Sequence, residues 1–258
     1  MPNKVLVIAE IGHNGNGNMR LNKLMIEEAK ACGADIAKFQ LYDTDVIKKP
    51  WQSRYMELKM AELTKEDVFE LKAHCDKVGI EFMASAFDPI RVAWLEEVGV
   101  KRHKLASRSI YDKETIDAMV ATGKPIIASL GKWKNPAPNV EGKELIVGNM
   151  KYIFPSFKAE FLYCISEYPA YITEEMFPNI FSNKQTGDDK TGGYAGFSDH
   201  SLGMYWAREA VKRGATIIEK HFTLDKSLPG FNQKGSCDPT ELKDFITYVR
   251  QAERGIKY

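Results

Sequence analysis

The chain has 258 residues, of which 44% are hydrophobic and 28% are charged, a composition typical of a soluble enzyme. Its 36 basic and 35 acidic side chains nearly cancel, so no overall field attracts DNA, RNA or an anionic membrane. An anionic ligand must therefore be bound by a local cluster of side chains.

Short β-branched and aromatic runs alternate with amphipathic runs along the whole chain. The first kind predicts strands at residues 5–9, 35–40, 81–86, 102–107, 125–130, 160–166, 194–199 and 216–222. The second kind predicts helices at residues 19–33, 64–79, 88–99, 112–123 and 238–255. The helix at 64–79 begins with Thr64 as N-cap and Asp67 three residues later, which is close to a capping box.

Eight strands in alternation with helices predict a (β/α)8 TIM barrel, with residues 1–258 as a single domain. The alternative is a doubly wound open sheet, which favours a GxGxxG turn after the first strand. The turn here reads GHNGNG, and its glycines do not have that spacing, so we favour the barrel. Residues 131–158 contain several prolines and no helical period, and the sequence leaves open whether they form a lid, an interface loop or an irregular crossover.

Polar side chains stand at the carboxyl end of every predicted strand, where (β/α)8 barrels carry their active sites. They are Glu10, Lys38, Gln40, Ser85, Asp88, Lys104, Ser107, Ser129, Ser166, Tyr168, Ser198, Asp199, His200, Glu219 and His221. A lone Lys or Ser at such a position is usually a solvated rim residue or a turn residue. Agreement among all eight strand ends instead predicts one shared site.

The residue types restrict the chemistry of this site. Lys38 and Lys104, together with the serine hydroxyls, suit a small molecule with several negative charges, such as a phosphate ester that also carries a carboxylate. His200 and His221 follow successive strands and can hold one divalent cation with positions left open for water and substrate. Lys220 alternates to the opposite face of its strand, where we expect a structural or ion-pairing role.

The cysteines and the N-terminal sequence bear on the compartment. The four cysteines are far apart and form no CxxC pair, which favours a reducing cytosol over a disulfide framework. The first apolar run has only five residues and leads directly into Glu10, so we expect no signal peptide. We therefore expect a cytoplasmic protein.

Seven motifs together resemble the sialic acid synthase (N-acetylneuraminate synthase) family, over residues 4–255. The motifs are IAEIGHNGNG, AKFQ, KLAS, CISEYP, GFSDHSLG, IIEKHFTLD and DPTEL, in the order and approximate spacing of that family. The resemblance implies a (β/α)8 barrel that condenses phosphoenolpyruvate with the aldehyde of an N-acetylmannosamine-like amino sugar. The products would be a nonulosonic, sialic-acid-like acid and phosphate.

The resemblance also implies roles for the matching residues. Contacts with phosphoenolpyruvate are implied for Lys38, Lys104, Ser107, Ser129 and Ser198, with Gln40 and Ser85 in the same pocket. His200 and His221 would bind Mn2+ or Mg2+, and Glu10 would lie near the metal and the aldehyde. Glu219 would lie near the acceptor, and the further substrate-binding residues would be Ser166, Tyr168, Asp199 and Asn232.

Three departures from the family pattern concern the acceptor. The chain ends shortly after DPTEL, so we expect the family's C-terminal antifreeze-like domain to be absent, which leaves acceptor recognition and a homo-oligomer open. The family's NHxG motif reads Asn14-Gly15-Asn16-Gly17, without the histidine. The Asp usual in the loop after FTLD is Asn232, which lacks the charge that normally meets sugar hydroxyls.

These departures keep other functions open. One alternative is a synthase for a different aldehyde or a sugar phosphate, and another is a barrel that binds a ligand without turnover. A metal-dependent hydrolase or isomerase is a further alternative. In each case the expected partners are small molecules, and neither a nucleic acid nor a membrane is expected.

Overall fold

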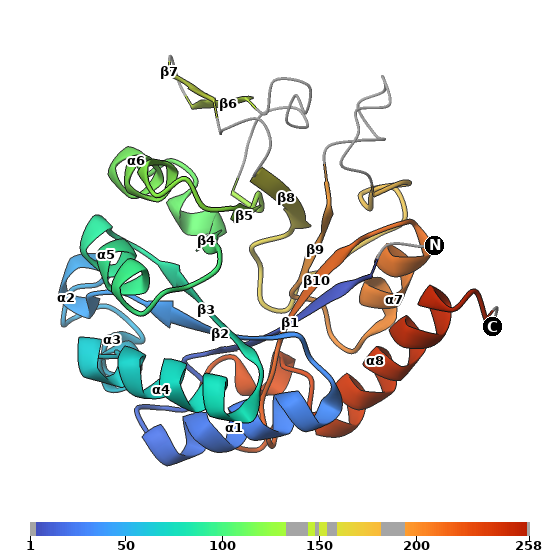
Figure 1. Cartoon of the computed structure of the whole chain (residues 1–258), viewed down its shortest axis with the longest axis horizontal. Helices are drawn as coiled ribbons and strands as arrows, with labels where there is room; N and C mark the ends of the chain where they lie inside the picture. The colour runs from blue at the N-terminus through green and yellow to red at the C-terminus, as the bar shows by residue number, and fades with distance from the viewer. Residues whose placement is uncertain (1–3, 133–143, 148–149, 154–158, 182–193, 257–258) are drawn as a thin grey trace.

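The barrel predicted from the sequence is present in the computed structural model, which describes residues 4–132, 144–147, 150–153, 159–181 and 194–256. Eight parallel strands close in the order β1-β10-β9-β8-β5-β4-β3-β2 (Figure 1). Their bounds are β1 (Leu6–Gly12), β2 (Ile36–Leu41), β3 (Glu81–Ala86), β4 (His103–Leu105), β5 (Ile126–Ser129), β8 (Ala159–Cys164), β9 (Gly196–Asp199) and β10 (Ile217–His221). Each of the eight predicted strands overlaps one of them, so the predicted (β/α)8 TIM-barrel fold is confirmed.

Helices follow most of the strands. They are α1 (Met19–Cys32), α2 (Thr44–Ile47), α3 (Tyr55–Ala61), α4 (Lys65–Val78), α5 (Pro89–Glu97), α6 (Lys113–Ala121), α7 (Tyr205–Lys212) and α8 (Pro239–Glu253), with 3-10 turns η1 (Ser107–Ser109) and η2 (Gln233–Gly235). The five predicted helices correspond to α1, α4, α5, α6 and α8. The capping box at Thr64 and Asp67 is confirmed, and it satisfies backbone N–H groups at the start of α4 that lack partners within the helix.

The predicted excursion at 131–158 contains a strand pair outside the barrel. β6 (Glu144–Val147) and β7 (Met150–Ile153) pair antiparallel in a separate two-stranded sheet. Residues 133–143, 148–149 and 154–158 of this excursion lie outside the described residues. The described part of the excursion is therefore a strand pair and not the helix that usually follows a strand of such a barrel.

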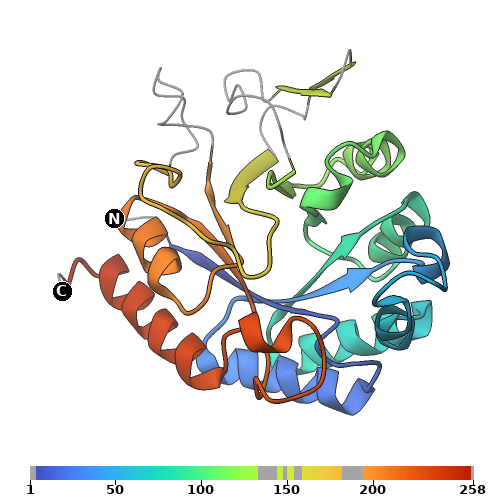
Figure 2. The ribbon, with the colours of Figure 1, turned by 180° about the vertical axis from the view of Figure 1, so that it is seen from behind.

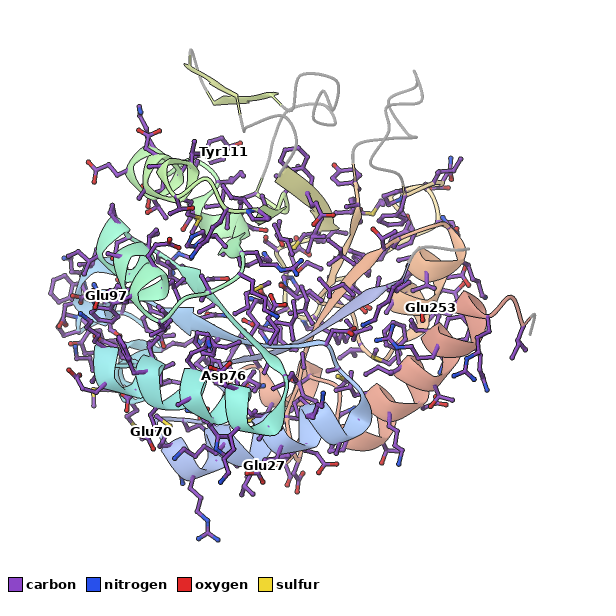
Figure 3. The ribbon with its side chains drawn as sticks, viewed as in Figure 1. Glu27, Glu70, Asp76, Glu97, Tyr111 and Glu253 are labelled. Atoms are coloured by element: carbon purple, nitrogen blue, oxygen red, sulfur yellow. The ribbon has the colours of Figure 1, made fainter. Side chains whose placement is uncertain are left out.

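Apolar residues form two layers, one on each side of the barrel wall. The outer layer packs the strands against the helices, among which α1 and α8 lie side by side in both ribbon views (Figures 1 and 2). Charged groups such as Glu27, Glu70, Asp76 and Glu97 are exposed on the outer surface of this helical layer (Figure 3). The inner layer is a compact cluster that contains Ile8, Ile36, Met83, Ile127, Leu162 and Ile217.

The described residues bear on two further expectations. No helix among them is long and apolar enough to cross a membrane. All four cysteines are free and buried.

Candidate active site

The alternation of strand side chains places a polar layer directly above the inner apolar layer. Two residues beyond the apolar cluster, the same face of each strand carries a polar or sulfur-containing side chain, at Glu10, Lys38, Ser85, Ser129, Cys164 and Glu219. The apolar cluster closes the barrel below, so these side chains face the carboxyl end of the strands. All of them except Cys164 line a pocket of about 270 Å³.

All of the residues predicted at the strand ends line this pocket except Asp199 and Asp88, and Asn232 lines it too. Asp88 instead caps α5, where its Oδ1 accepts from the backbone N–H of Arg91 at 2.8 Å. Residues that are as far apart in the sequence as Glu10 and Asn232 meet there because the eight strand ends converge. The structure therefore brings together the positions that the sequence placed at the strand ends. Their substrate contacts remain predictions.

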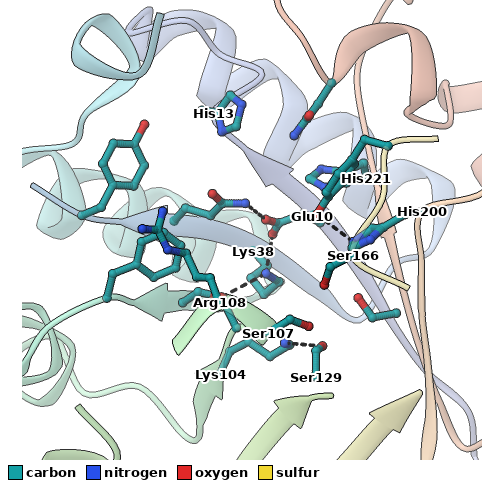
Figure 4. A pocket seen from close by; sticks show the side chains of 18 of the residues that line it. Glu10, His13, Lys38, Lys104, Ser107, Arg108, Ser129, Ser166, His200 and His221 are labelled. Atoms are coloured by element: carbon teal, nitrogen blue, oxygen red, sulfur yellow. Dashed lines mark hydrogen bonds and ion pairs between the residues drawn. The ribbon is translucent and has the colours of Figure 1, made fainter. Parts of the chain in front are cut away.

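A buried network of charges forms the floor of the pocket (Figure 4). The Nζ of Lys38 is 2.7 Å from Oε2 of Glu10 and 3.5 Å from Oε2 of Glu219. The Nζ of Lys104 donates to Oγ of Ser129 at 2.7 Å and lies 3.9 Å from Oε2 of Glu219. The two lysines are only 2% and 1% exposed, so their charges require partners or an anionic ligand.

Burial and charge pairing separate the two carboxyl groups. Burial raises the pKa of Glu10, and although Lys38 opposes the shift, the nearby Glu219 carboxylate adds to it. Burial also acts to raise the pKa of Glu219, but Lys104, Lys38 and the hydroxyl of Ser198 together hold it below its ordinary value. Two carboxyl groups with opposite shifts in one pocket can act as a proton donor and a proton acceptor.

The two lysines also differ. Burial acts to lower the pKa of Lys38, but Glu10 and Glu219 raise it overall, so this ammonium is well neutralised. Burial lowers the pKa of Lys104, and Glu219 offsets that effect only in part. Of the two lysines, Lys104 is therefore the one whose charge a bound anion would stabilise more.

His200 and His221 lie next to each other on one side of the pocket, with ring centroids 5.7 Å apart (Figure 4). Burial acts to lower the pKa of His200, but Cys164 and the carbonyl of Ile165 raise it overall. The Nδ1 of His200 is 2.8 Å from the carbonyl oxygen of Ile165, which can only accept, so in the neutral ring Nδ1 carries the proton and Nε2 is the acceptor. That Nε2 lies 3.0 Å from the hydroxyl of Tyr168. The ring of Tyr168 covers His200 with centroids 4.1 Å apart.

The two imidazoles fit an open divalent metal site. Burial lowers the pKa of His221 well below its ordinary value, which keeps the ring neutral, and its buried Nδ1 makes no hydrogen bond with any described residue. Within the described part of the chain, no group of three His, Cys, Asp or Glu side chains is arranged to hold a metal. Two protein ligands would leave the remaining positions to water and substrate oxygens, as a catalytic rather than a structural site requires.

Asp199 has a different place from the one predicted. It is 1% exposed and points away from the pocket, where Lys220 donates from Nζ to Oδ2 at 2.9 Å. Its Oδ1 accepts from both the backbone N–H and the hydroxyl of Ser201. Strand alternation explains this outcome, because the neighbouring Ser198 faces inward. We therefore remove Asp199 from the substrate-binding set, and the ion-pairing role predicted for Lys220 is confirmed.

Replacing Lys220 with methionine is expected to destabilise the barrel by about 3–5 kcal/mol, because Asp199 would be left as an unpaired buried charge. Urea unfolding measures this change in the free energy of unfolding. The double variant Asp199→Asn/Lys220→Met is expected to recover most of the loss, since the amide oxygen still accepts from Ser201. A single variant as stable as the wild type contradicts the assignment.

Several pocket residues were not identified from the sequence. Arg108 reaches the pocket from η1, and His13 lies in the turn that follows β1 (Figure 4). Arg108 directly follows the strand predicted at 102–107, and His13 lies in the glycine-rich turn after the strand predicted at 5–9, so both positions could have been found from the sequence. Arg54 stands at the start of α3, in a segment for which no helix was predicted, and the sequence offered no signal for it.

The structure describes the surroundings of two departures from the family pattern, Gly15 and Asn232. A Cβ atom at Gly15 would lie 1.9 Å from Oδ1 of Asn22, so a side chain there would require Asn22 to move. Asn14, which precedes it, donates to the carbonyl oxygen of Phe222 at 2.9 Å and thereby joins the loops after β1 and β10. Asn232 is 8% exposed and lines the pocket.

Comparison with known proteins finds relatives that match almost the whole of this chain. The chain is 36% identical to the uncharacterized protein MJ1065 of Methanocaldococcus jannaschii, over 96% of this chain and 71% of that protein. It is 33% identical to an N,N'-diacetyllegionaminic acid synthase of Legionella pneumophila, over 96% of this chain and 72% of the relative. It is 30% identical to the human N-acetylneuraminate-9-phosphate synthase, over 97% of this chain and 70% of the relative.

The fold is also similar to a solved structure. The crystal structure of a sialic acid synthetase from Leptospira borgpetersenii in complex with citrate superposes with a TM-score of 0.82 and 31% identity, covering 99% of this chain and 86% of that one. The sequence profile described as the NeuB family matches residues 25–257. On this match and these identities, the chain belongs to the NeuB family.

Proposed function

We propose that this barrel condenses phosphoenolpyruvate with the aldehyde of an N-acetylmannosamine-like amino sugar and releases a nonulosonic acid and phosphate. The observation that carries the proposal is the joint presence of two buried lysines, two carboxyl groups and two neighbouring imidazoles in one pocket. The names of the synthases among its relatives support the same class of product.

The lysine side of the pocket is proposed to bind phosphoenolpyruvate. Lys38 and Lys104 would neutralise its phosphate and carboxylate groups. The hydroxyls that would donate to the same oxygens come from Ser85, Ser107, Ser129 and Ser198. Fixed cations beside the phosphate stabilise the charge that builds up as the carbon–oxygen bond breaks.

The reaction balances with one molecule of water. Carbon 3 of phosphoenolpyruvate forms a bond to the aldehyde carbon, and the aldehyde oxygen takes up a proton, for which Glu10 is the proposed donor. Water adds at carbon 2 and gives its proton to Glu219, whose lowered pKa keeps it ionised. The hydroxyl now on carbon 2 then gives its proton to the phosphate as the carbonyl of the 2-keto acid forms, the bond between carbon 2 and the phosphate oxygen breaks, and hydrogen phosphate leaves with the electron pair of that bond.

The remaining residues of the pocket are proposed to bind the acceptor and the metal. Gln40 donates to Oε1 of Glu10 at 2.6 Å and would keep that carboxyl group oriented. Ser166, Tyr168 and Asn232 would contact the sugar. His200 and His221 would hold Mn2+ or Mg2+, and the chemistry that such an ion supplies is polarisation of the aldehyde oxygen.

A phosphate-release assay with phosphoenolpyruvate, Mn2+ and a panel of aldehydes tests the proposal. Release with N-acetylmannosamine and not with other sugars is the expected result. Phosphate release with a different aldehyde or with a sugar phosphate would identify that compound as the acceptor in place of N-acetylmannosamine. No phosphate release with any of them would overturn the proposed reaction. Metal-dependent binding of phosphoenolpyruvate without turnover, measured by calorimetry, would instead support a ligand-binding barrel.

Because all four cysteines are free, we place the reaction in the reducing cytoplasm.

A further inference from the structure

His13 is a buried imidazole at the pocket with an unused nitrogen. It follows β1, lines the pocket and is 8% exposed. Its buried Nδ1 makes no hydrogen bond with any residue that the structure describes. Such a nitrogen at a pocket wall is free to bond to a ligand.

The partner of its other nitrogen fixes the proton on Nδ1. The guanidinium of Arg54 lies 3.1 Å from Nε2 of His13, and a guanidinium can only donate, so Nε2 is the acceptor. Burial, with the help of Arg54, lowers the pKa of His13 to about 4, and Glu57 and Gln40 offset this only in part. At neutral pH the ring is therefore uncharged, and Nδ1 is an N–H donor.

Arg54 is itself held in place by contacts with helix α3 and with the loop after β10. Its guanidinium donates to both carboxylate oxygens of Glu57, at 3.2 and 3.3 Å, and lies 3.7 Å from the ring centroid of Phe231. Glu57 in turn accepts from the backbone N–H of Phe231 at 3.0 Å. Arg54 has a φ of 66°, a left-handed conformation that is uncommon outside glycine and often occurs at functional sites.

The position of His13 assigns it to the acceptor rather than to phosphoenolpyruvate. It lies on the far side of Glu10 and Lys38 from Lys104 and Ser129 (Figure 4). It is near enough to His221 to lower the pKa of that ring. A neutral N–H donor recognises an uncharged oxygen, such as a carbonyl or hydroxyl oxygen of a sugar, better than it neutralises a phosphate.

We propose that His13, oriented by Arg54, positions the acceptor sugar by donating from Nδ1 to one of its uncharged oxygens. The inference rests on the proposed function and adds a recognition residue just before the stretch that corresponds to NHxG, two residues before Gly15. It supplies an imidazole to the wall of the pocket although the histidine of the NHxG motif is missing.

Replacing His13 with leucine tests the proposal. The expected result is a KM for the acceptor that rises about 10-fold or more, with the KM for phosphoenolpyruvate unchanged, because only the acceptor loses a hydrogen bond. His13→Asn is expected to restore most of the acceptor affinity, since the Asn amide N–H occupies nearly the place of Nδ1. His74→Leu is the matched control, because His74 pairs with Glu27 on the outer helices and should leave both constants unchanged.

Calorimetry of sugar binding in the presence of phosphoenolpyruvate separates the possible failures. A folded His13→Leu variant that binds N-acetylmannosamine as tightly as the wild type overturns the inference, whether or not phosphate is released. A wild type that binds the sugar but never releases phosphate overturns the proposed reaction alone, and one that binds no sugar overturns both. If His13→Leu weakens the binding of N-acetylmannosamine but not of mannose, Nδ1 donates to the acyl carbonyl oxygen. If it weakens the binding of both sugars equally, Nδ1 donates to a hydroxyl oxygen. If His13→Leu does not fold, Arg54→Met tests the inference in its place. Its loss of acceptor affinity is expected to be smaller than the loss expected for His13→Leu.

Discussion

Lys104→Met is expected to lower kcat/KM for phosphoenolpyruvate about 1,000-fold, which is the size of effect seen when one preorganised charge-stabilising group is lost. Lys104 is 1% exposed, and its protein partners neutralise it less than those of Lys38. A phosphate or carboxylate oxygen beside Nζ would accept a hydrogen bond from this ammonium group and balance its charge. Methionine has a similar length but no charge, so the pocket keeps its shape and loses its attraction for the anion.

The fold should tolerate this substitution. Glu219 keeps Lys38 at 3.5 Å and the hydroxyl of Ser198 at 2.9 Å, so it is not left without a partner. Phosphate-release kinetics measure the loss of activity, and thermal unfolding measures whether the barrel is intact. Lys101→Met is the control, since Lys101 is exposed just before β4 and should leave the kinetics unchanged. A folded Lys104→Met variant within 10-fold of the wild type would remove Lys104 from the proposed site.

The sequence predicted the barrel and most of the pocket for one physical reason. In a barrel strand, an inward apolar side chain is followed two residues later by another inward side chain, so Ile8 with Glu10 and Ile36 with Lys38 define one face. The same rule, applied to the strand that ends in GFSD, separates the inward Ser198 from the outward Asp199. The prediction from the strand ends, which did not distinguish the two faces, placed Asp199 in the pocket.

The parts that the sequence did not predict depend on contacts between loops. Arg54, the N-cap of α3, has a left-handed backbone and makes no side-chain capping hydrogen bond, so no local signal marks the start of this helix. Its position is fixed instead by Glu57 and by Phe231, a residue far away in the chain. The proton position on His13 follows from the same contacts, and neither periodicity nor motif spacing predicts it.

His200→Ala and His221→Ala are each expected to weaken Mn2+ binding and to lower phosphate release by on the order of 100-fold or more, as removal of Lewis-acid assistance implies. If both imidazoles hold one ion, the double variant should be little slower than either single variant, because the second loss removes a contribution that is already gone. Treating the wild type with EDTA should reproduce the same residual rate, and added Mn2+ should restore it only in the wild type.

A buried histidine outside the pocket separates metal binding from structure. His103 is fully buried on β4 but faces outward, with Nε2 2.8 Å from Oε1 of Glu96. His103→Ala should therefore lose stability in urea unfolding while the folded fraction still binds Mn2+, as followed by electron paramagnetic resonance. Fully additive losses in the His200/His221 double variant would mean that the two rings act separately. The 5.7 Å between the two rings would then reflect packing in the pocket rather than a shared ion.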